Sequence, residues 1–197
     1  LDGTPISIQG SEAHQVILVG HKERIELPEE WSAPEFPIIR QLPCGKILVV
    51  DTGMVVDGAK NAWVMSASGK KLAHFEVGAG VIEAVGLWGM IAVAYHPASA
   101  RAFGHKVQPL QRSAIAFFDL NGRLLAGFNQ EAGRVGVAAE NVRCLTAISP
   151  VELLFVPERL TSYGNEIQNP VVLYDCTLRR PVVFSAPLPR AEAVTMA

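Results

Sequence analysis

Cysteine is scarce in this chain of 197 residues, and its spacing excludes two common roles. Cys44, Cys144 and Cys176 form an odd set, and no two of them stand at the Cys-x-x-Cys spacing of redox motifs and zinc knuckles. We therefore expect no disulfide framework. Each cysteine lies in or beside an apolar stretch, where a thiol commonly packs as a small hydrophobic group. This usage predicts a reducing, cytoplasmic location.

Long hydrophobic runs are also missing. No stretch approaches the roughly 20 apolar residues of a membrane-spanning helix. The longest candidate, residues 81–95, is interrupted by Glu83 and Gly86 and predicts two core strands instead. The opening residues 1–5 have neither the basic head nor the apolar stretch of a signal peptide, so we expect a protein without a membrane partner.

Charge of either sign is sparse, at 18% of the residues, and the formal net charge is −2. Nucleic-acid binders usually carry a basic stripe. Here the adjacent pairs of basic residues are Lys70-Lys71 and Arg179-Arg180, and both fall at expected hairpin turns, where a solvated charge is the ordinary outcome. A nucleic-acid partner is therefore not expected.

Motifs that carry catalytic chemistry are absent. The sequence contains no GxGxxG, Walker, HExxH or GxSxG pattern. The five histidines are dispersed and never stand at the spacing of metal ligands: His14, His21, His74, His96 and His105. We expect no cofactor, no metal site and no catalytic residue.

What the sequence does contain is a repeated phrase. Residues 69–75 (GKKLAHF) and 122–128 (GRLLAGF) are close copies, and residues 178–184 (LRRPVVF) are a weaker one. Each copy follows a short apolar run: 62–65, 114–118 and 171–174. Self-similarity at a spacing of about 50 residues is typical of a repeat architecture.

Each repeat holds four expected strands. Upstream of the apolar run lie two more short apolar segments per unit, at 37–42 and 46–51, 81–87 and 90–95, and 143–148 and 152–157. Four antiparallel strands, repeated, form the blade of a β-propeller. Gly69 and Gly122 supply the positive φ of a tight hairpin. Because Leu72 and Phe75 cannot share a face of an ideal strand, we expect a bulge or a local twist there.

The two ends of the chain predict how the ring closes. Residues 5–9, 15–19 and 23–27 are expected to be the second, third and fourth strands of a blade that lacks its first, and residues 191–196 form an additional strand. The sequence thus predicts an all-β, four-bladed β-propeller whose last blade is closed by N- and C-terminal strands, with about 49 residues per blade. The predicted blades are 33–78, 79–130, 138–186, and 187–197 with 1–32. A partial or larger propeller and a different all-β fold are the alternatives.

The units resemble blades of the NHL, gluconolactonase-like and WD-repeat propellers, through the pattern at Trp63–Phe75 and Ile115–Phe128. The resemblance implies a fold and no specific activity. The WD dipeptide and the metal-ligand set of those families are missing. The terminal disulfide of the four-bladed hemopexin-type ring also has no counterpart, because Cys44 is far from either end.

The innermost strands offer two carboxylates and two arginines: Glu83, Glu192, Arg40 and Arg143. Lactonase-type propellers instead gather carboxylates and amides around a cation on this axis. The mixture here predicts ion pairs along the axis.

Long connections between the second and third strands of each blade are expected on one face, at 52–61, 96–112 and 158–169, together with the linkers 28–35 and 130–138. Long loops on a rigid scaffold are commonly functional. Arginine and aromatic residues, which anchor interfaces, are frequent in them. The expected partner-binding residues are Arg101, Phe103, His105, Lys106, Arg112, Arg159, Tyr163, Asn165 and Glu166. Trp31 and Phe36 either join this surface or cap the first blade.

The favoured hypothesis is a non-catalytic protein-binding module, and its most specific form is a bacterial immunity or antitoxin protein that binds a cognate toxin. The alternative is a hydrolase of the lactonase type that uses Glu83, Asp51, Asp57 or His96 near the axis. Self-association through Trp88 or an imperfectly closed rim is a third possibility.

Overall fold

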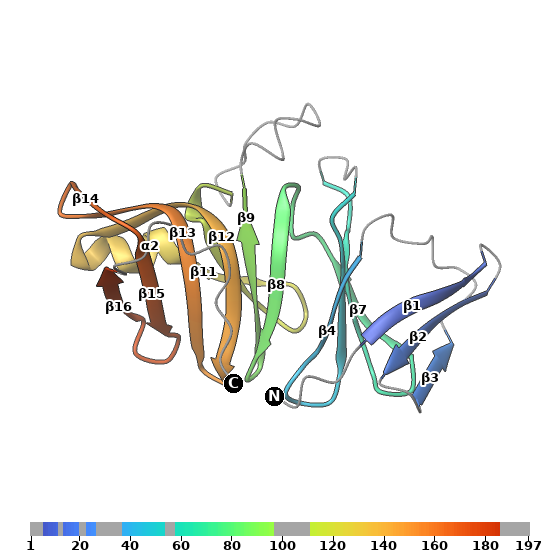
Figure 1. Cartoon of the computed structure of the whole chain (residues 1–197). Coiled ribbons are helices and arrows are strands. Elements are labelled where there is room, and N and C mark those ends of the chain that lie inside the picture. Colours follow the sequence, from blue (N-terminus) through green and yellow to red (C-terminus); the bar gives the residue numbers. More distant parts are fainter. Residues whose placement is uncertain are drawn as a thin grey trace.

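The computed structural model describes residues 6–11, 14–19, 23–26, 37–53, 58–96 and 111–185. The chain is all-β in architecture, and all of its described strand pairs are antiparallel. The strands form four sheets (Figure 1), each built by consecutive strands of the chain. None of the helical segments that the structure describes is long and apolar enough to span a membrane.

The N-terminal sheet contains β1 (Ile6–Ser11), β2 (His14–Val19) and β3 (Glu23–Glu26). The second sheet contains β4 (Pro37–Gln41), β5 (Ile47–Asp51), β6 (Ala62–Met65) and β7 (Lys71–Phe75). The third contains β8 (Val81–Leu87), β9 (Met90–Tyr95), β10 (Ile115–Asp119) and β11 (Leu124–Gly127). The fourth contains β12 (Val137–Ser149), β13 (Glu152–Ser162), β14 (Asn165–Ile167), β15 (Pro170–Asp175) and β16 (Arg180–Ser185). The second and third sheets confirm the predicted four-strand units, and the fourth sheet has the four predicted strands with β14 added beside β13.

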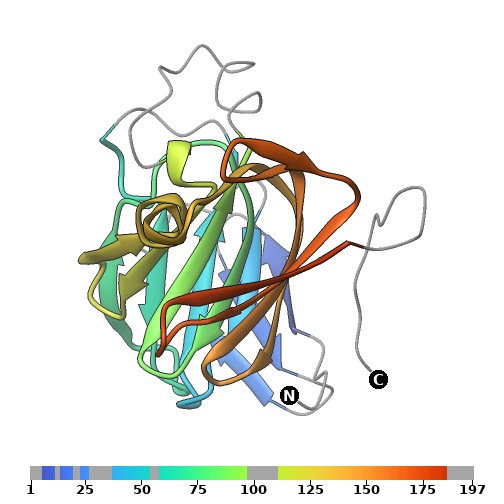
Figure 2. The same ribbon diagram turned by 90° about the vertical axis from the view of Figure 1, so that its left-hand side faces the viewer.

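The sheets stand in a row, joined through their first strands. The strands β1 and β4 contact each other, as do β4 and β8, and β8 and β12. In Figure 1 the N-terminal sheet lies at one end of the row and the fourth sheet at the other, and Figure 2 views the row from the fourth sheet. Antiparallel meanders that pack side by side in this way make the fold propeller-like. Closure by residues 191–196 stays a prediction, because these residues lie outside the described ranges.

Neighbouring sheets approach closely at the ends of their first strands. Gly86 lies against Leu42, and a Cβ atom at Gly86 would overlap the leucine side chain. The N–H of Trp88 donates a 2.6 Å hydrogen bond to the carbonyl of Pro150, which links the β8–β9 turn to the β12–β13 turn. Glycine at position 86 therefore lets the first strands of two sheets come together.

The strand β10 contributes side chains to the buried clusters on both faces of the third sheet. Successive side chains of a strand point to opposite faces. Phe118 faces the second sheet, where its ring lies 6.2 Å from that of Phe75, and Phe117 faces the fourth sheet, 5.6 Å from the ring of Tyr174. Two buried clusters result, one on each face of the third sheet. Apolar residues on both faces are what a sheet in the interior of the row requires.

The irregularity predicted at Leu72 to Phe75 is a bulge, and the second close copy of the repeat has one at the same place. The β6–β7 register shifts between Val64 and Met65, and the β10–β11 register shifts between Phe117 and Phe118. Gly122 has φ 87°, and a Cβ atom there would overlap the ring of Phe75. The turn glycine of one repeat thus makes room for the phenylalanine of the previous one.

The prediction that Phe128 ends a strand is wrong. Phe128 is the first residue of the helix α2 (Phe128–Ala132), which is followed by a 3₁₀ turn, η2 (Gly133–Val135). Asn129 explains this local structure. Its amide nitrogen donates 2.8 Å hydrogen bonds to the carbonyls of Arg112 and Ala139, and its amide oxygen accepts one from the N–H of Ala139. The predicted linker 130–138 is therefore mostly helical, and the predicted blade 79–130 ends inside α2.

The prediction that residues 158–169 form a loop is also wrong. The strand β13 continues to Ser162, β12 begins at Val137, and β14 adds a short strand beside β13. The predicted strand 152–157 ended at Pro157, and proline cannot donate a hydrogen bond to the ladder. It pairs with Val142 where the β12–β13 register shifts, and a bulge tolerates a missing donor.

Candidate functional site

A two-residue turn at the end of the extended hairpin carries the most exposed aromatic side chain of the described residues. Ser162 pairs with Asn165 across the turn, so Tyr163 and Gly164 form its two central positions. Their φ angles are 49° and 81°. Positive φ at both positions defines the turn that best matches the twist of a hairpin, and asparagine and glycine are the usual residues there. We call Ser162, Tyr163, Gly164 and Asn165 the hairpin tip.

The ring of Tyr163 is supported on one side and open on the other. The N–H of Tyr163 donates a 2.7 Å hydrogen bond to the carbonyl of Gly136. A Cβ atom at Gly136, which has φ 75°, would overlap the tyrosine ring, so the ring lies on bare backbone. Tyr163 nevertheless remains 80% exposed, and the neighbouring Val135 is 43% exposed. The hairpin tip therefore presents a fixed aromatic ring to solvent.

Charged side chains lie beside the tip on three adjacent strands. Arg159 on β13 pairs with Glu140 on β12 at 3.2 Å and with Glu166 on β14 at 3.5 Å. The hydrogen bond to Glu166 and the charge of Glu140 raise the pKa of Arg159 above its ordinary value. All three side chains are about half exposed or more, so the group is a solvated ladder of charges at the rim of the fourth sheet.

The structure brings together some of the predicted partner-binding residues. Arg159 and Glu166 form an ion pair. Tyr163 lies in the turn between β13 and β14, and Asn165 is the first residue of β14. Arg112 is exposed in the 3₁₀ turn η1 (Gln111–Ser113), and the structure shows its backbone carbonyl bound by Asn129. The remaining predicted residues lie outside the described ranges: Arg101, Phe103, His105, Lys106, Trp31 and Phe36.

Ion pairing along the first strands is confirmed for Arg40 and Glu83. Nη2 of Arg40 donates a 2.7 Å hydrogen bond to Oε1 of Glu83, joining β4 to β8. Arg143 on β12 lies 3.8 Å from Glu158 instead. Glu192, the other carboxylate predicted near this axis, lies outside the described residues.

The carboxylate of Glu158 on β13 interacts with three side chains: Asn141, His96 and Arg143. Nδ2 of Asn141 donates a 2.6 Å hydrogen bond to its carboxylate, and His96 and Arg143 lie at 3.6 and 3.8 Å. The Asn141 hydrogen bond is the main cause that lowers the pKa of Glu158, and the charges of His96 and Arg143 add to it. This carboxylate is thus ionised and already bound at neutral pH.

The side chains proposed for a lactonase do not form a common site in the described structure. Glu83 is held by Arg40, His96 lies beside Glu158, and a carboxylate oxygen of Asp51 accepts the N–H of Gly53 at 2.9 Å. Asp57 lies outside the described residues. In the ranges that the structure describes, no three His, Cys, Asp or Glu side chains gather in a way that could hold a metal ion.

Sequence reasoning missed the residues that support the tip. Gly136 and Glu140 were expected in or beside a linker, yet Gly136 lies against Tyr163 and Glu140 pairs with Arg159. The sequence carried one usable signal, because glycine at 136 and glycine at 164 both mark backbone with positive φ. Neither glycine indicates by itself that the two segments meet.

No protein-family model matches this chain, and no curated protein matches it either. Among solved structures, a eukaryotic initiation factor is similar with a TM-score of 0.45 and 13% sequence identity over 94% of this chain. The WD40 β-propeller domain of Doa1 is similar with a TM-score of 0.43 and 10% identity over 92% of this chain. The similarity covers 38% of the first of those chains and 64% of the second, so this chain spans less than two thirds of either.

Proposed function

We propose that this chain is a non-catalytic protein-binding module and that Tyr163 is its central contact residue. The observation that supports the proposal most is the backbone of Tyr163, with φ 49°, combined with an 80% exposed side chain. The left-handed conformation costs an L-residue roughly 1–2 kcal/mol. A ring that remains exposed to water contributes little free energy of burial to offset this cost. Residues held in such conformations cluster at functional sites, which is why we assign a function to this one.

The surroundings of Tyr163 suit recognition of a protein surface. Tyrosine is enriched among the residues that contribute most to binding, because it buries a large amphipathic ring at a low cost in side-chain entropy. Val135, which precedes Gly136 in the chain, is a second exposed apolar residue, and the Arg159, Glu140 and Glu166 ladder supplies a polar rim. The turn and the β-ladder hold the ring in place before a partner arrives, which reduces the entropy lost on binding.

The more specific form of the proposal is an immunity or antitoxin protein. A projecting turn with a single exposed aromatic ring fits a concave surface, and the substrate sites of enzymes are clefts or cavities. In this form of the proposal, Tyr163 enters the substrate cleft of a toxic enzyme and excludes the substrate.

Site-specific photo-crosslinking in the native cell tests both forms. A photoreactive phenylalanine analogue replaces Tyr163, and the matched control places it at Trp88, which is 69% exposed in a different hairpin turn. We expect one discrete crosslinked protein from position 163 and none from position 88. The purified partner should then bind Tyr163→Asn at least about 30-fold more weakly than the wild type, as for a residue worth about 2 kcal/mol.

Two results separate the general proposal from its specific form. Equal affinity of the partner for the wild type and Tyr163→Asn contradicts the assignment of Tyr163. A partner that binds through position 163 but has no activity that the chain inhibits leaves the binding module in place and rejects the immunity role.

A further inference from the structure

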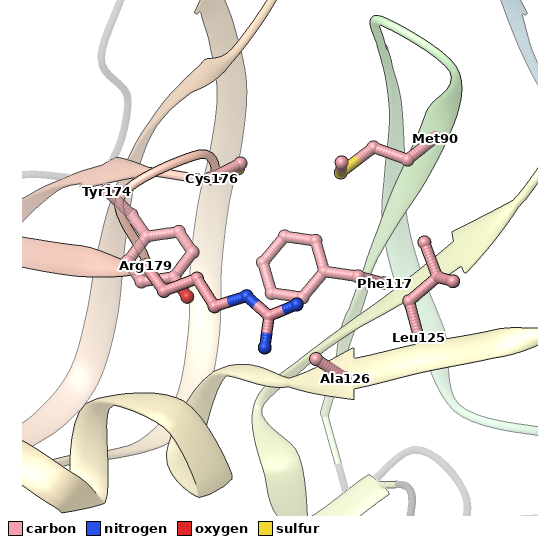
Figure 3. A pocket seen from close by; sticks show the side chains of 7 residues that line it. All are labelled: Met90, Phe117, Leu125, Ala126, Tyr174, Cys176 and Arg179. Atoms are coloured by element: carbon pink, nitrogen blue, oxygen red, sulfur yellow. The ribbon is translucent and has the colours of Figure 1, made fainter.

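The fourth sheet has two faces, and the structure shows what packs on one of them. Leu153 and Phe155 of β13, and Val172 and Tyr174 of β15, belong to the buried cluster between the third and fourth sheets. Figure 3 shows Tyr174 beside Phe117 of β10, and the two rings stack with 5.6 Å between their centroids. We call this side of the fourth sheet the inner face.

The residues that alternate with the inner ones point to the other side of the sheet, because successive side chains of a strand point to opposite faces. On β16 the inner residue is Val183, which packs against the same buried cluster. The alternate residues of β13, β15 and β16 form what we call the outer face: Leu154, Val156, Val171, Leu173, Val182 and Phe184. The strand register makes them contiguous, since Leu154 pairs with Leu173, Leu173 with Val182, and Val171 with Phe184.

The fourth sheet is therefore apolar on both faces. A sheet with one face in water alternates apolar and polar residues along each strand, whereas strands that are covered on both faces read as continuous apolar runs. The strand β13 contains the run Leu-Leu-Phe-Val at 153–156, and β15 reads Pro-Val-Val-Leu-Tyr before its final aspartate. This is the sequence of a sheet whose two faces are both covered.

The outer face is open beside β16. The exposed fraction is 4% for Val156 on β13 and rises to 50% for both Val182 and Phe184 on the edge strand. The neighbouring segments β8, β9 and α2, which contact this sheet, all contribute side chains to the cluster on the inner face. A further segment, from outside the described ranges or from another molecule, is needed to cover the part of the outer face beside β16.

The size of the outer face decides between a second molecule and a segment of the same chain. Strands lie about 4.8 Å apart and residues on one face repeat about every 6.8 Å, so six positions on three strands cover on the order of 200 Å². A stable complex of two chains buries about 800 Å² on each partner. The outer face is too small to hold a second copy by itself, whereas a covalently attached segment has an effective concentration on the order of millimolar.

Residues 186–197 leave the described structure beside the open part of the face, because they follow Ser185, the last residue of β16. Twelve residues reach up to about 40 Å when extended, and three strands span only roughly 15 Å. Pro187 and Pro189 disfavour a continuation of β16 along its ladder, since proline has no N–H to donate. The segment is thus long enough to cross the outer face and is not suited to extend the sheet.

The composition of this segment matches an apolar face. Its charged residues are Arg190 and Glu192, and their charges cancel. Leu188, Val194 and Met196 supply large apolar side chains, and most of the other residues are alanine.

We propose that residues 186–197 fold back over the outer face and pack their leucine, valine and methionine side chains against Val182 and Phe184. The segment then covers the end of the row of sheets and keeps an apolar surface from associating with other chains. The N-terminal strands, which are the other predicted partner of residues 191–196, lie at the opposite end of the row (Figure 1). This contact does not involve Tyr163 and goes beyond the proposed protein-binding function.

Methyl NMR on the full chain tests the contact directly. The measurement is the set of nuclear Overhauser effects between the methyl groups of residues 186–197 and those of Leu173 and Val182 on the outer face. We expect such effects to both residues. The matched control is Leu124, which is 51% exposed on β11, the edge strand of the third sheet, and should show none.

The same spectra identify any other arrangement. Effects from residues 186–197 to β1, β2 or β3 place the segment at the N-terminal sheet, and a complete lack of effects to the outer face leaves that face uncovered by this segment. Either result overturns the proposal. A sample mixed from labelled and unlabelled chains separates contacts within one chain from contacts between two. Contacts that occur only between chains also overturn the proposal, because a second copy then covers the face.

A matched pair of variants tests whether the outer face holds the segment. Val182→Asn places an amide on the outer face, and Leu124→Asn places one on an equally exposed edge-strand residue elsewhere. We expect hydrogen exchange of the amides of residues 190–196 to become at least about fivefold faster in Val182→Asn, since burial of the exposed half of a valine side chain is worth about that factor. Leu124→Asn should leave the exchange unchanged. Unchanged exchange in Val182→Asn, with the methyl signals of Val172 showing that the sheet is folded, overturns the proposal.

Discussion

Arg40 on β4 and Glu83 on β8 form a 2.7 Å ion pair that bridges the first strands of the second and third sheets, 43 residues apart in the sequence. The two side chains are 42% and 25% exposed. The pair therefore resembles a surface salt bridge in energy, and it helps to fix how neighbouring sheets align more than it stabilises the fold.

A double-mutant cycle measures that energy. For Arg40→Gln and Glu83→Gln we expect a coupling of about 0.5–1 kcal/mol in urea unfolding, falling as salt is added. The control pair is Arg123 and Asp119, which are 3.6 Å apart with the arginine 78% exposed, and its coupling should be close to zero. A coupling above about 2 kcal/mol would show that the Arg40 and Glu83 pair is a buried structural element instead.

Phe128→Ala should destabilise the chain by about 3–5 kcal/mol, because Phe128 is fully buried and packs edge-on against Phe155 and Tyr174. The matched control is Phe184→Ala on β16, where the same side chain is 50% exposed and the loss should be about 1 kcal/mol. Chemical denaturation gives both values. Similar losses at the two positions are incompatible with the core described between the third and fourth sheets.

Gly122→Ala and Gly45→Ala separate backbone strain from packing. Both glycines have positive φ, 87° and 76°, but only the Cβ atom at position 122 would meet another side chain, the ring of Phe75. Gly45→Ala should cost about 1 kcal/mol from the backbone alone. Gly122→Ala should cost a further 1–3 kcal/mol or so from overpacking. Equal thermal stability of the two variants would contradict the contact between successive repeats.

The acid sensitivity of Glu158 follows from its partners. Its pKa in the folded state is depressed, so its contribution to stability is present above the unfolded-state pKa and is lost as the pH falls through the folded-state value. Asn141→Gly keeps the positive φ of 51° and removes the main hydrogen-bond donor. We expect the pKa of Glu158 to rise toward its ordinary value in that variant, measured by carboxyl NMR titration. An unchanged titration curve would assign the depression to His96 and Arg143.

Most of the strand framework was predictable from the sequence, because apolar runs and turn glycines recur in register. The strands β4 to β11 begin and end within two residues of their expected positions. Local signals failed where tertiary contacts decide the structure. Phe128 ends a repeated segment that was expected to form a strand. Instead, Asn129 donates hydrogen bonds to two carbonyls distant in the sequence, and the residues from Phe128 form a helix. The strand expected at 152–157 continues beyond Pro157, because the β12–β13 register shift accommodates the proline.

The candidate site was predictable only in part. Tyr163 was identified as a partner-binding residue because it is an aromatic in a stretch read as a long loop, although that stretch is a hairpin. Its support by Gly136 depends on two segments that meet only in the folded chain.

The central claim is that Tyr163 is kept at the hairpin tip for recognition and at some cost to folding. Equilibrium unfolding of Tyr163→Asn tests this most directly, because asparagine adopts the left-handed conformation with less strain. We predict that the free energy of unfolding rises by about 0.5–1 kcal/mol relative to the wild type. A fall of about 1 kcal/mol or more would show that the ring stabilises the fold through Gly136, and it would contradict the functional assignment of Tyr163.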